Sequence, residues 1–203
     1  MKKNAFTLAE ILIALSIIGV ISAITLSSIH QIMPDKDKGV VLKVFQTLNE
    51  VNRNVLGNPS LYMFNSDCPA HIMMCNAKPV DGEHENDKYQ GINKYPSLLM
   101  DNLTLSDSAP TPSGGSCSFT TSDGLVWSVA SDSNNGYDII IDTGNDKRQD
   151  CTYSSSCKNP RKFKFNVNSD GVTKAVDNLS KAYLMNPNDL NDRSADLQKA
   201  ASL

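Results

Sequence analysis

The sequence has few of the residues and motifs on which catalysis depends. It contains three histidines, His30, His71 and His84, and they do not cluster at the spacing of metal ligands. No glycine-rich phosphate loop, Gly-x-Ser-x-Gly turn or pair of catalytic carboxylates is visible along the chain. We therefore expect this protein not to be an enzyme.

An excess of basic residues is also missing. The chain has 19 Lys and Arg residues against 22 Asp and Glu residues, which gives a formal net charge of −3. Surfaces that coat nucleic acid carry clustered positive charge, so we expect no nucleic-acid partner. Aromatic residues make up only 6% of the chain, and 203 residues allow one modest domain besides any membrane anchor.

Charge of either sign is absent from one long stretch, residues 11–33. At about 1.5 Å of rise per residue, this stretch as a helix spans roughly 35 Å, and a bilayer core is about 30 Å thick. Lys2 and Lys3 precede it without any acidic residue, so the positive-inside rule keeps the short leader cytoplasmic. The pattern predicts a single membrane-spanning helix.

A secretory signal peptide is the alternative, because it too combines N-terminal positive charge with an apolar core. The run here is longer than the usual core of about 7–15 residues. Glu10 stands at its edge, and a carboxylate in the membrane region costs roughly 2.5–3.5 kcal/mol on insertion scales. Such a charge usually has a partner, and cleavage before Phe6 would supply one as a new α-amino group.

Residues 5–15 read Ala-Phe-Thr-Leu-Ala-Glu-Ile-Leu-Ile-Ala-Leu. They resemble the class III signal of type IV pilins and type II secretion pseudopilins, although Ala5 stands where this signal usually has Gly. The resemblance implies cleavage by a prepilin peptidase between Ala5 and Phe6, followed by N-methylation of Phe6. It also implies that Glu10 guides docking of the subunit into a growing filament. The likeness is close over about the first quarter of the chain and only architectural beyond it.

The same resemblance implies a fold and a setting. The fold is α+β, with a long N-terminal helix whose first half is transmembrane, packed on a small antiparallel β-sheet. The implied partners are copies of the chain itself, other pilins or pseudopilins, the prepilin peptidase, an inner-membrane assembly platform and membrane lipid. The implied location is the bacterial inner membrane, crossed once with the C-terminal domain outside the cytoplasm, and then the pilus or pseudopilus.

The chain divides into five segments. They are a leader at 1–5, a transmembrane and assembly helix at 6–33, an amphipathic stem helix at 34–57, a globular domain at 58–177 and a polar tail at 178–203. Pro34 predicts a break between the two helical segments, and the charges at 35–38 mark the membrane–water boundary. The tail is rich in Asn and Asp, so we expect it to be peripheral or partly disordered.

Periodicity predicts the elements of the globular part. From Val40 to Val55 apolar residues recur at spacings of three and four, which indicates a helix ending at Gly57 with an apolar stripe that a sheet would cover. A short helix is expected at 95–100. Strands are expected at 116–121, 125–129, 137–142, 162–167 and 172–176, the first two joined by an Asp123–Gly124 turn, with Trp127 in the core.

The five cysteines all lie after the apolar run and would therefore face an oxidising compartment. Neighbours in sequence are expected to pair as Cys68–Cys75 and Cys151–Cys157, which leaves Cys117 over. Each bridge closes a short loop, so it constrains the unfolded chain only modestly.

One loop offers hard oxygen donors from Asp142, Asn145, Asp146 and Asp150. Calcium takes 6–8 oxygen ligands, so a calcium site is one interpretation of this loop. The residues lack the EF-hand spacing, and a plain acidic turn is the alternative.

We expect a structural subunit, a pilin or pseudopilin of a type IV pilus or type II secretion filament, assembled through its N-terminal helix. The alternative is a membrane-anchored extracytoplasmic binding protein with an uncleaved N-terminal anchor, using the loop at 68–107. The sequence leaves open which filament system would use the subunit.

Overall fold

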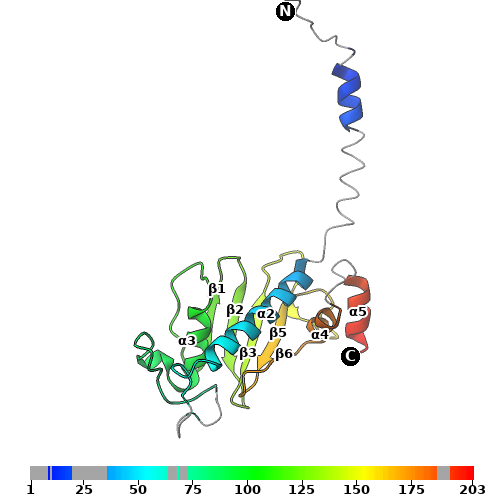
Figure 1. Cartoon of the computed structure of the whole chain (residues 1–203). Coiled ribbons are helices and arrows are strands. Elements are labelled where there is room, and N and C mark those ends of the chain that lie inside the picture. The colour runs from blue at the N-terminus through cyan, green and yellow to red at the C-terminus, as the bar shows by residue number, and fades with distance from the viewer. Residues whose placement is uncertain (1–8, 10, 20–35, 64–67, 69–72, 187–192) are drawn as a thin grey trace, which may run out of the picture.

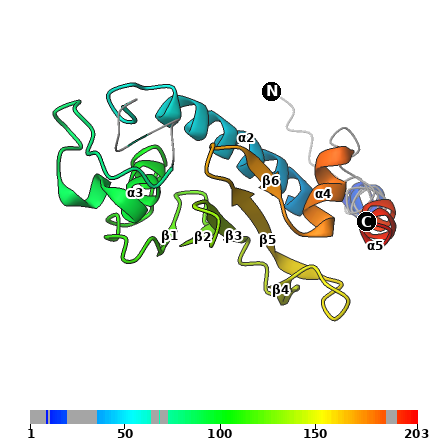
Figure 2. The same cartoon turned by 90° about the horizontal axis from the view of Figure 1, so that it is seen from below.

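The computed structural model describes residues 9, 11–19, 36–63, 68, 73–186 and 193–203. Helix α2 (Lys36–Leu56) lies along one face of a six-stranded sheet, so the α+β class predicted from the sequence is confirmed. Helix α3 (Lys94–Asp101) lies at the C-terminal end of α2, and helices α4 (Asn178–Met185) and α5 (Arg193–Ala201) lie at its N-terminal end (Figures 1 and 2). Two short 3-10 helices, η2 (Asp87–Tyr89) and η3 (Gly91–Asn93), precede α3.

Helix α2 packs on the sheet through the stripe that its periodicity predicted. Val41, Val44, Leu48, Val51 and Val55 are each at most 5% exposed. Fully burying one such side chain contributes about 1.5–3 kcal/mol, so this stripe is a principal contact between helix and sheet. The helix ends as expected, since the Gly57 amide donates to the Arg53 carbonyl over 2.9 Å.

The predicted strands are present and form most of the sheet. Strand β1 (Cys117–Thr120) and strand β2 (Val126–Ser131) make a hairpin around Asp123–Gly124, where Gly124 has a φ of +84°. Strand β2 pairs with β3 (Tyr137–Asp142), and β3 pairs with β5 (Pro160–Val167), both antiparallel. Alternate residues face the core, among them Phe119, Trp127, Val129, Ile139, Ile141, Phe163 and Phe165.

The far edge of β5 is shared by two short strands. Strand β6 (Thr173–Ala175) pairs antiparallel with its end, as expected, but β4 (Gln149–Thr152) pairs parallel with its start. The sheet is therefore mixed, and the expectation of a purely antiparallel sheet is wrong on this point. Strand β4 escaped prediction because Gln-Asp-Cys-Thr has no apolar alternation, and none of its residues is buried.

Within residues 178–186 and 193–203, the C-terminal segment is largely helical and packs on the domain, which corrects the expectation of a peripheral tail. Asp177 caps α4, its carboxylate accepting the Ser180 amide over 2.8 Å, and Leu179, Ala182 and Tyr183 are fully buried. Helix α4 packs on both α2 and α5. A capping Asp ahead of apolar residues at helical spacing was therefore a usable signal in this segment.

The far end of α2 is held by a buried polar residue. Asn52 donates to the Gly171 carbonyl and to Thr173, and it accepts the Tyr95 hydroxyl over 2.7 Å. These bonds join α2 to β6 and to α3, the short helix predicted near 95–100. Every polar group of this contact has a hydrogen-bond partner, so burying these groups costs little free energy.

Candidate functional site

The residues with predicted processing and assembly roles, Ala5, Phe6 and Glu10, lie outside the described residues, as does much of the predicted helix at 6–33. Residues 11–19 are helical. Their large apolar side chains Ile11, Leu12, Ile13, Leu15, Ile17 and Ile18 are each between 51% and 61% exposed. Within the described ranges, no helix reaches the length and apolar character that a membrane crossing needs.

The chain enters the globular domain through the first turn of α2, and charged side chains hold this turn. The Lys38 ammonium lies 2.6 Å from a carboxylate oxygen of Asp196 on α5, and both side chains are at most 2% exposed. The Lys38 nitrogen also lies 5.7 Å from the centre of the Tyr183 ring on α4. Lys38 is therefore inside the protein, and the membrane–water boundary expected at residues 35–38 stays a prediction.

Asp37, the preceding residue, makes a second set of ion pairs. Its carboxylate lies 2.5 Å from Nε of Arg148 in the β3–β4 loop and 3.2 Å from Nη1 of Arg193 on α5. Both guanidinium groups also donate to Oδ1 of Asn159, over 2.8 and 3.4 Å, and Arg193 donates to the Tyr183 hydroxyl. We call Asp37, Lys38, Arg148, Arg193 and Asp196 the junction clamp.

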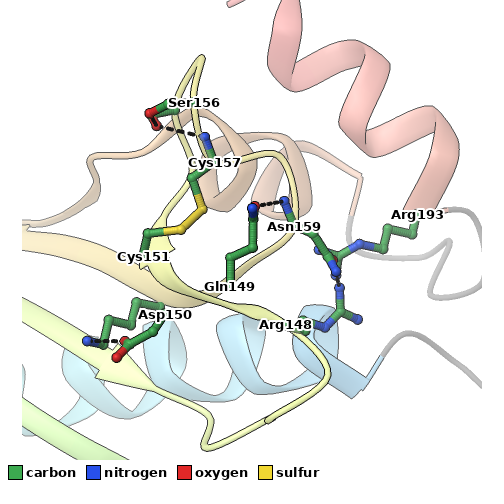
Figure 3. The surroundings of a disulfide bond; sticks show 10 residues. Arg148, Gln149, Asp150, Cys151, Ser156, Cys157, Asn159 and Arg193 are labelled. Carbon is green, nitrogen blue, oxygen red and sulfur yellow. Dashed lines mark hydrogen bonds and ion pairs between the residues drawn. A yellow bond between two sulfur atoms is a disulfide. The ribbon is translucent and has the colours of Figure 1, made fainter.

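The predicted Cys151–Cys157 bridge is present beside the clamp (Figure 3). Strands β4 and β5 are parallel, so residues 153–159 must run back from the end of β4 to the level of its start. Parallel strands normally need a connection of about a dozen residues, and this one is shorter. The disulfide links the end of β4 to this connection. Asn159 stands two residues after Cys157, and its backbone amide donates to the Gln149 side chain over 3.2 Å, so the bridged loop positions the residue that both arginines contact.

The other predicted bridge, Cys68–Cys75, is present as well, and Cys117 is a free thiol. Lys94 lies beside this bridge, with its ammonium 3.0 Å from Sγ of Cys75, 2.6 Å from the Ala77 carbonyl oxygen and 4.4 Å from the Tyr62 ring centre. Burial lowers the pKa of Lys94 to about 8. Burial also raises the pKa of the Cys117 thiol to about 11, which keeps it protonated and unreactive at neutral pH.

The three carboxylates among the candidate calcium ligands form ion pairs with one arginine of the protein. Arg161 on β5 places its nitrogens 3.1 Å from Asp142, 3.6 Å from Asp146 and 3.3 Å from Asp150. A hydrogen bond from Lys162 holds the pKa of Asp150 below its usual range. Asn145 instead accepts the Lys147 amide.

Among the described residues, no group of three or more His, Cys, Asp or Glu side chains has the arrangement of a metal site. Calcium binding by this loop stays a prediction, and an ion bound there would have to displace the guanidinium of Arg161. The acidic turn, the alternative interpretation, needs no such displacement.

Comparison with known proteins gives one match. Residues 1–26 match the family model described as the prokaryotic N-terminal methylation motif. None of the curated proteins and none of the solved structures that were compared matches the chain. The chain therefore carries a prepilin-type N-terminal signal for cleavage and methylation, as predicted from residues 5–15.

Sequence reasoning found the N-terminal signal and the two bridges but missed the junction clamp. Its members stand at positions 37, 38, 148, 193 and 196, and no local spacing connects them. Only the docking of α5 and of the β3–β4 loop on α2 brings them together. A weak signal existed in Arg193-Ser-Ala-Asp196, because Arg and Asp three residues apart share one face of a helix.

Proposed function

We propose that this chain, which carries a prepilin-type N-terminal methylation motif, is the precursor of a structural filament subunit. Its N-terminus resembles those of type IV pilins and type II secretion pseudopilins, and the subunit would serve one of these filament systems rather than catalyse a reaction. A prepilin peptidase removes residues 1–5, Phe6 becomes the methylated N-terminus, and residues 6–33 anchor the subunit in the inner membrane. The match of residues 1–26 to the methylation motif is the observation that carries this proposal.

The charge of Glu10 supports assembly through the N-terminal helix. No Lys or Arg lies within residues 4–35, and His30 stands 20 residues from Glu10, roughly 30 Å along a helix, so no basic side chain of this stretch can pair with Glu10. Cleavage before Phe6 creates a cationic amine four residues away, and in a filament this amine can come from an adjacent copy. Because an unpaired charge in the membrane is costly, such pairing favours the docked state over the isolated one.

The globular domain supports the proposal by leaving one face of its helix uncovered. The stripe from Val41 to Val55 is buried on the sheet, whereas Lys43, Gln46, Asn49, Glu50 and Arg53 on the other side of α2 are exposed. The stem helix therefore has a face open to a neighbouring subunit. The domain outside the cytoplasm also explains two disulfides in one small fold.

The test is filament assembly by Glu10→Leu in cells that lack the wild-type subunit. We expect normal membrane level and normal cleavage, because the substitution makes the segment more apolar and leaves Ala5, Phe6 and the basic leader unchanged. Sheared filament should be strongly reduced. Glu85→Leu is the matched control, since Glu85 is an exposed residue in the loop before η2 and lies outside α2.

Normal filament yield from Glu10→Leu would refute the docking role of Glu10. An uncleaved chain in the membrane fraction, with the peptidase present, would instead support the membrane-anchored binding protein. These two outcomes are separated by measuring membrane level, N-terminal processing and filament yield in the same cells.

A further inference from the structure

The junction clamp stands where the chain passes from residues 20–35 into the globular domain. Helix α2 begins at Lys36, and four side chains from other elements contact its first turn. They are Arg148 from the β3–β4 loop, Arg193 and Asp196 from α5, and Tyr183 from α4. Three separate parts of the domain therefore contact the same helical turn. The apolar stripe of α2 already packs the helix on the sheet, so these charged contacts are not what holds the helix in place.

The two charges at this turn have opposite relations to the helix dipole. Asp37 lies at the positive N-terminal end of α2, where a carboxylate is favoured, but a lysine at this end is disfavoured. Lys38 is nevertheless buried there, and Asp196 supplies the opposite charge at 2.6 Å. Asp196 lies in the first turn of α5, where its own charge is favoured.

A buried ion pair adds little net stability, because removing both charges from water offsets most of their attraction. What such a pair does provide is geometry: the ammonium must face the carboxylate, which restricts how the two helices can be placed. A hydrophobic contact of the same size would allow the first turn of α2 to slide or rotate on α5. The clamp therefore fits a role in positioning better than a role in stability.

We propose that the junction clamp fixes the placement of the first turn of α2, and thereby the direction from which the N-terminal segment leaves the domain. Lys38 and Asp196 are then positioning residues for filament assembly, and helix α5 is a required part of an assembly-competent subunit. This inference rests on the proposed function. In a filament, the domain and the N-terminal segment must both fit their neighbours, so a loosened junction reduces assembly even when the domain stays folded.

The central test compares Asp196→Asn with Asp196→Glu in the full-length chain. Asn keeps the size of Asp but removes the charge, whereas Glu keeps the charge. Amide hydrogen exchange of the detergent-solubilised chain should be at least about tenfold faster at residues 36–40 in Asp196→Asn, because the closed state then buries the Lys38 ammonium without the charge of Asp196. Sheared filament from cells should also fall at least about tenfold in this variant, and both values should largely recover in Asp196→Glu.

Two controls separate positioning from stability. Lys78→Gln breaks the pair that Lys78 forms with Asp87 at 2.6 Å outside α2, and these side chains are 39% and 91% exposed. It should change filament yield by less than about twofold, since exposed pairs contribute little. Leu98→Ala removes a buried side chain of α3, far from the clamp, and should lower thermal stability at least as much as Asp196→Asn. Its filament yield should stay well above that of Asp196→Asn.

The proposal is overturned if Asp196→Asn assembles as well as the wild type, or if Leu98→Ala loses filament to the same degree at the same loss of stability. If the wild-type chain itself forms no filament, the proposed function fails. The exchange rates at residues 36–40 then still decide whether the clamp holds the turn. The two failures are therefore distinguishable.

Discussion

The ammonium of Lys38 and the carboxylate of Asp196 lie 2.6 Å apart in the interior of the protein, although 158 residues separate them in the chain. This contact joins the first turn of α2 to the last helix of the fold. It makes the C-terminal segment part of the same structural unit as the stem helix. The consequences for stability, for the neighbouring loop and for assembly can be tested separately.

Replacing one residue of the buried pair should destabilise the protein more than replacing both with apolar residues. We expect Asp196→Ala to lower the free energy of unfolding by about 3–5 kcal/mol, because Lys38 is left buried without this partner. The double variant Lys38→Met with Asp196→Leu should recover most of that loss. Urea unfolding followed by circular dichroism measures both, and a double variant no more stable than Asp196→Ala would contradict this account.

Two glycines of the stem helix should respond in opposite directions to alanine. A Cβ at Gly39 would meet no atom within 4 Å, so Gly39→Ala should stabilise the helix by about 1 kcal/mol. A Cβ at Gly57 would lie 2.6 Å from the Arg53 carbonyl oxygen, so Gly57→Ala should be destabilising. Thermal unfolding of the two variants side by side is the measurement, and shifts of the same sign would refute the difference in local geometry.

The Cys151–Cys157 bridge should support the clamp through Asn159. Replacing both cysteines with serine should lower the free energy of unfolding by about 2 kcal/mol, the value expected for so short a loop. Hydrogen exchange should also become faster at residues 36–40, because Arg148 and Arg193 lose a fixed partner. The same change at Cys68 and Cys75 is the control, since that bridge lies near Lys94 and away from the clamp. Equal acceleration in both variants would argue against the coupling.

Lys94 should make stability depend on pH in the alkaline range. Its pKa is about 8 in the folded state, below the ordinary value near 10.4 of an unfolded lysine. Between these values the unfolded chain binds more protons, so the contribution of this group to the free energy of unfolding rises with pH, by at most about 1.4 kcal/mol per unit. Comparing wild type with Lys94→Met from pH 7.5 to 9.5 isolates this contribution.

The wild type should gain stability relative to Lys94→Met as the pH rises, and parallel profiles would contradict the burial of this charge. Lys174→Met is the matched control, because Lys174 is an exposed lysine, and its profile should follow that of the wild type.

The parts of the fold that were predictable have local and periodic signals. The stripe from Val41 to Val55 and the alternation in β5 each repeat within a few residues, so they identify a helix and a strand without knowledge of their partners. The two disulfides were predictable for a similar reason, because each joins cysteines six or seven positions apart. The N-terminal signal is likewise contiguous.

The features that escaped prediction depend on contacts between distant segments. Strand β4 is held by its ladder to β5 rather than by apolar burial, so its composition does not identify it. Lys38 has the sequence context of a surface residue, and only the docking of α5 makes it an interior one. The carboxylates of the 142–150 loop have the composition of a calcium site, yet Arg161, from the next strand in the sheet, lies among them.

The proposed function rests on processing at Phe6, and the mass of the mature N-terminus in the native host tests it most directly. Mass spectrometry of the membrane and filament fractions should find an N-terminal peptide that begins at Phe6 and carries one added methyl group on its amine. A chain that retains Met1 in the membrane of cells containing the prepilin peptidase would contradict the account.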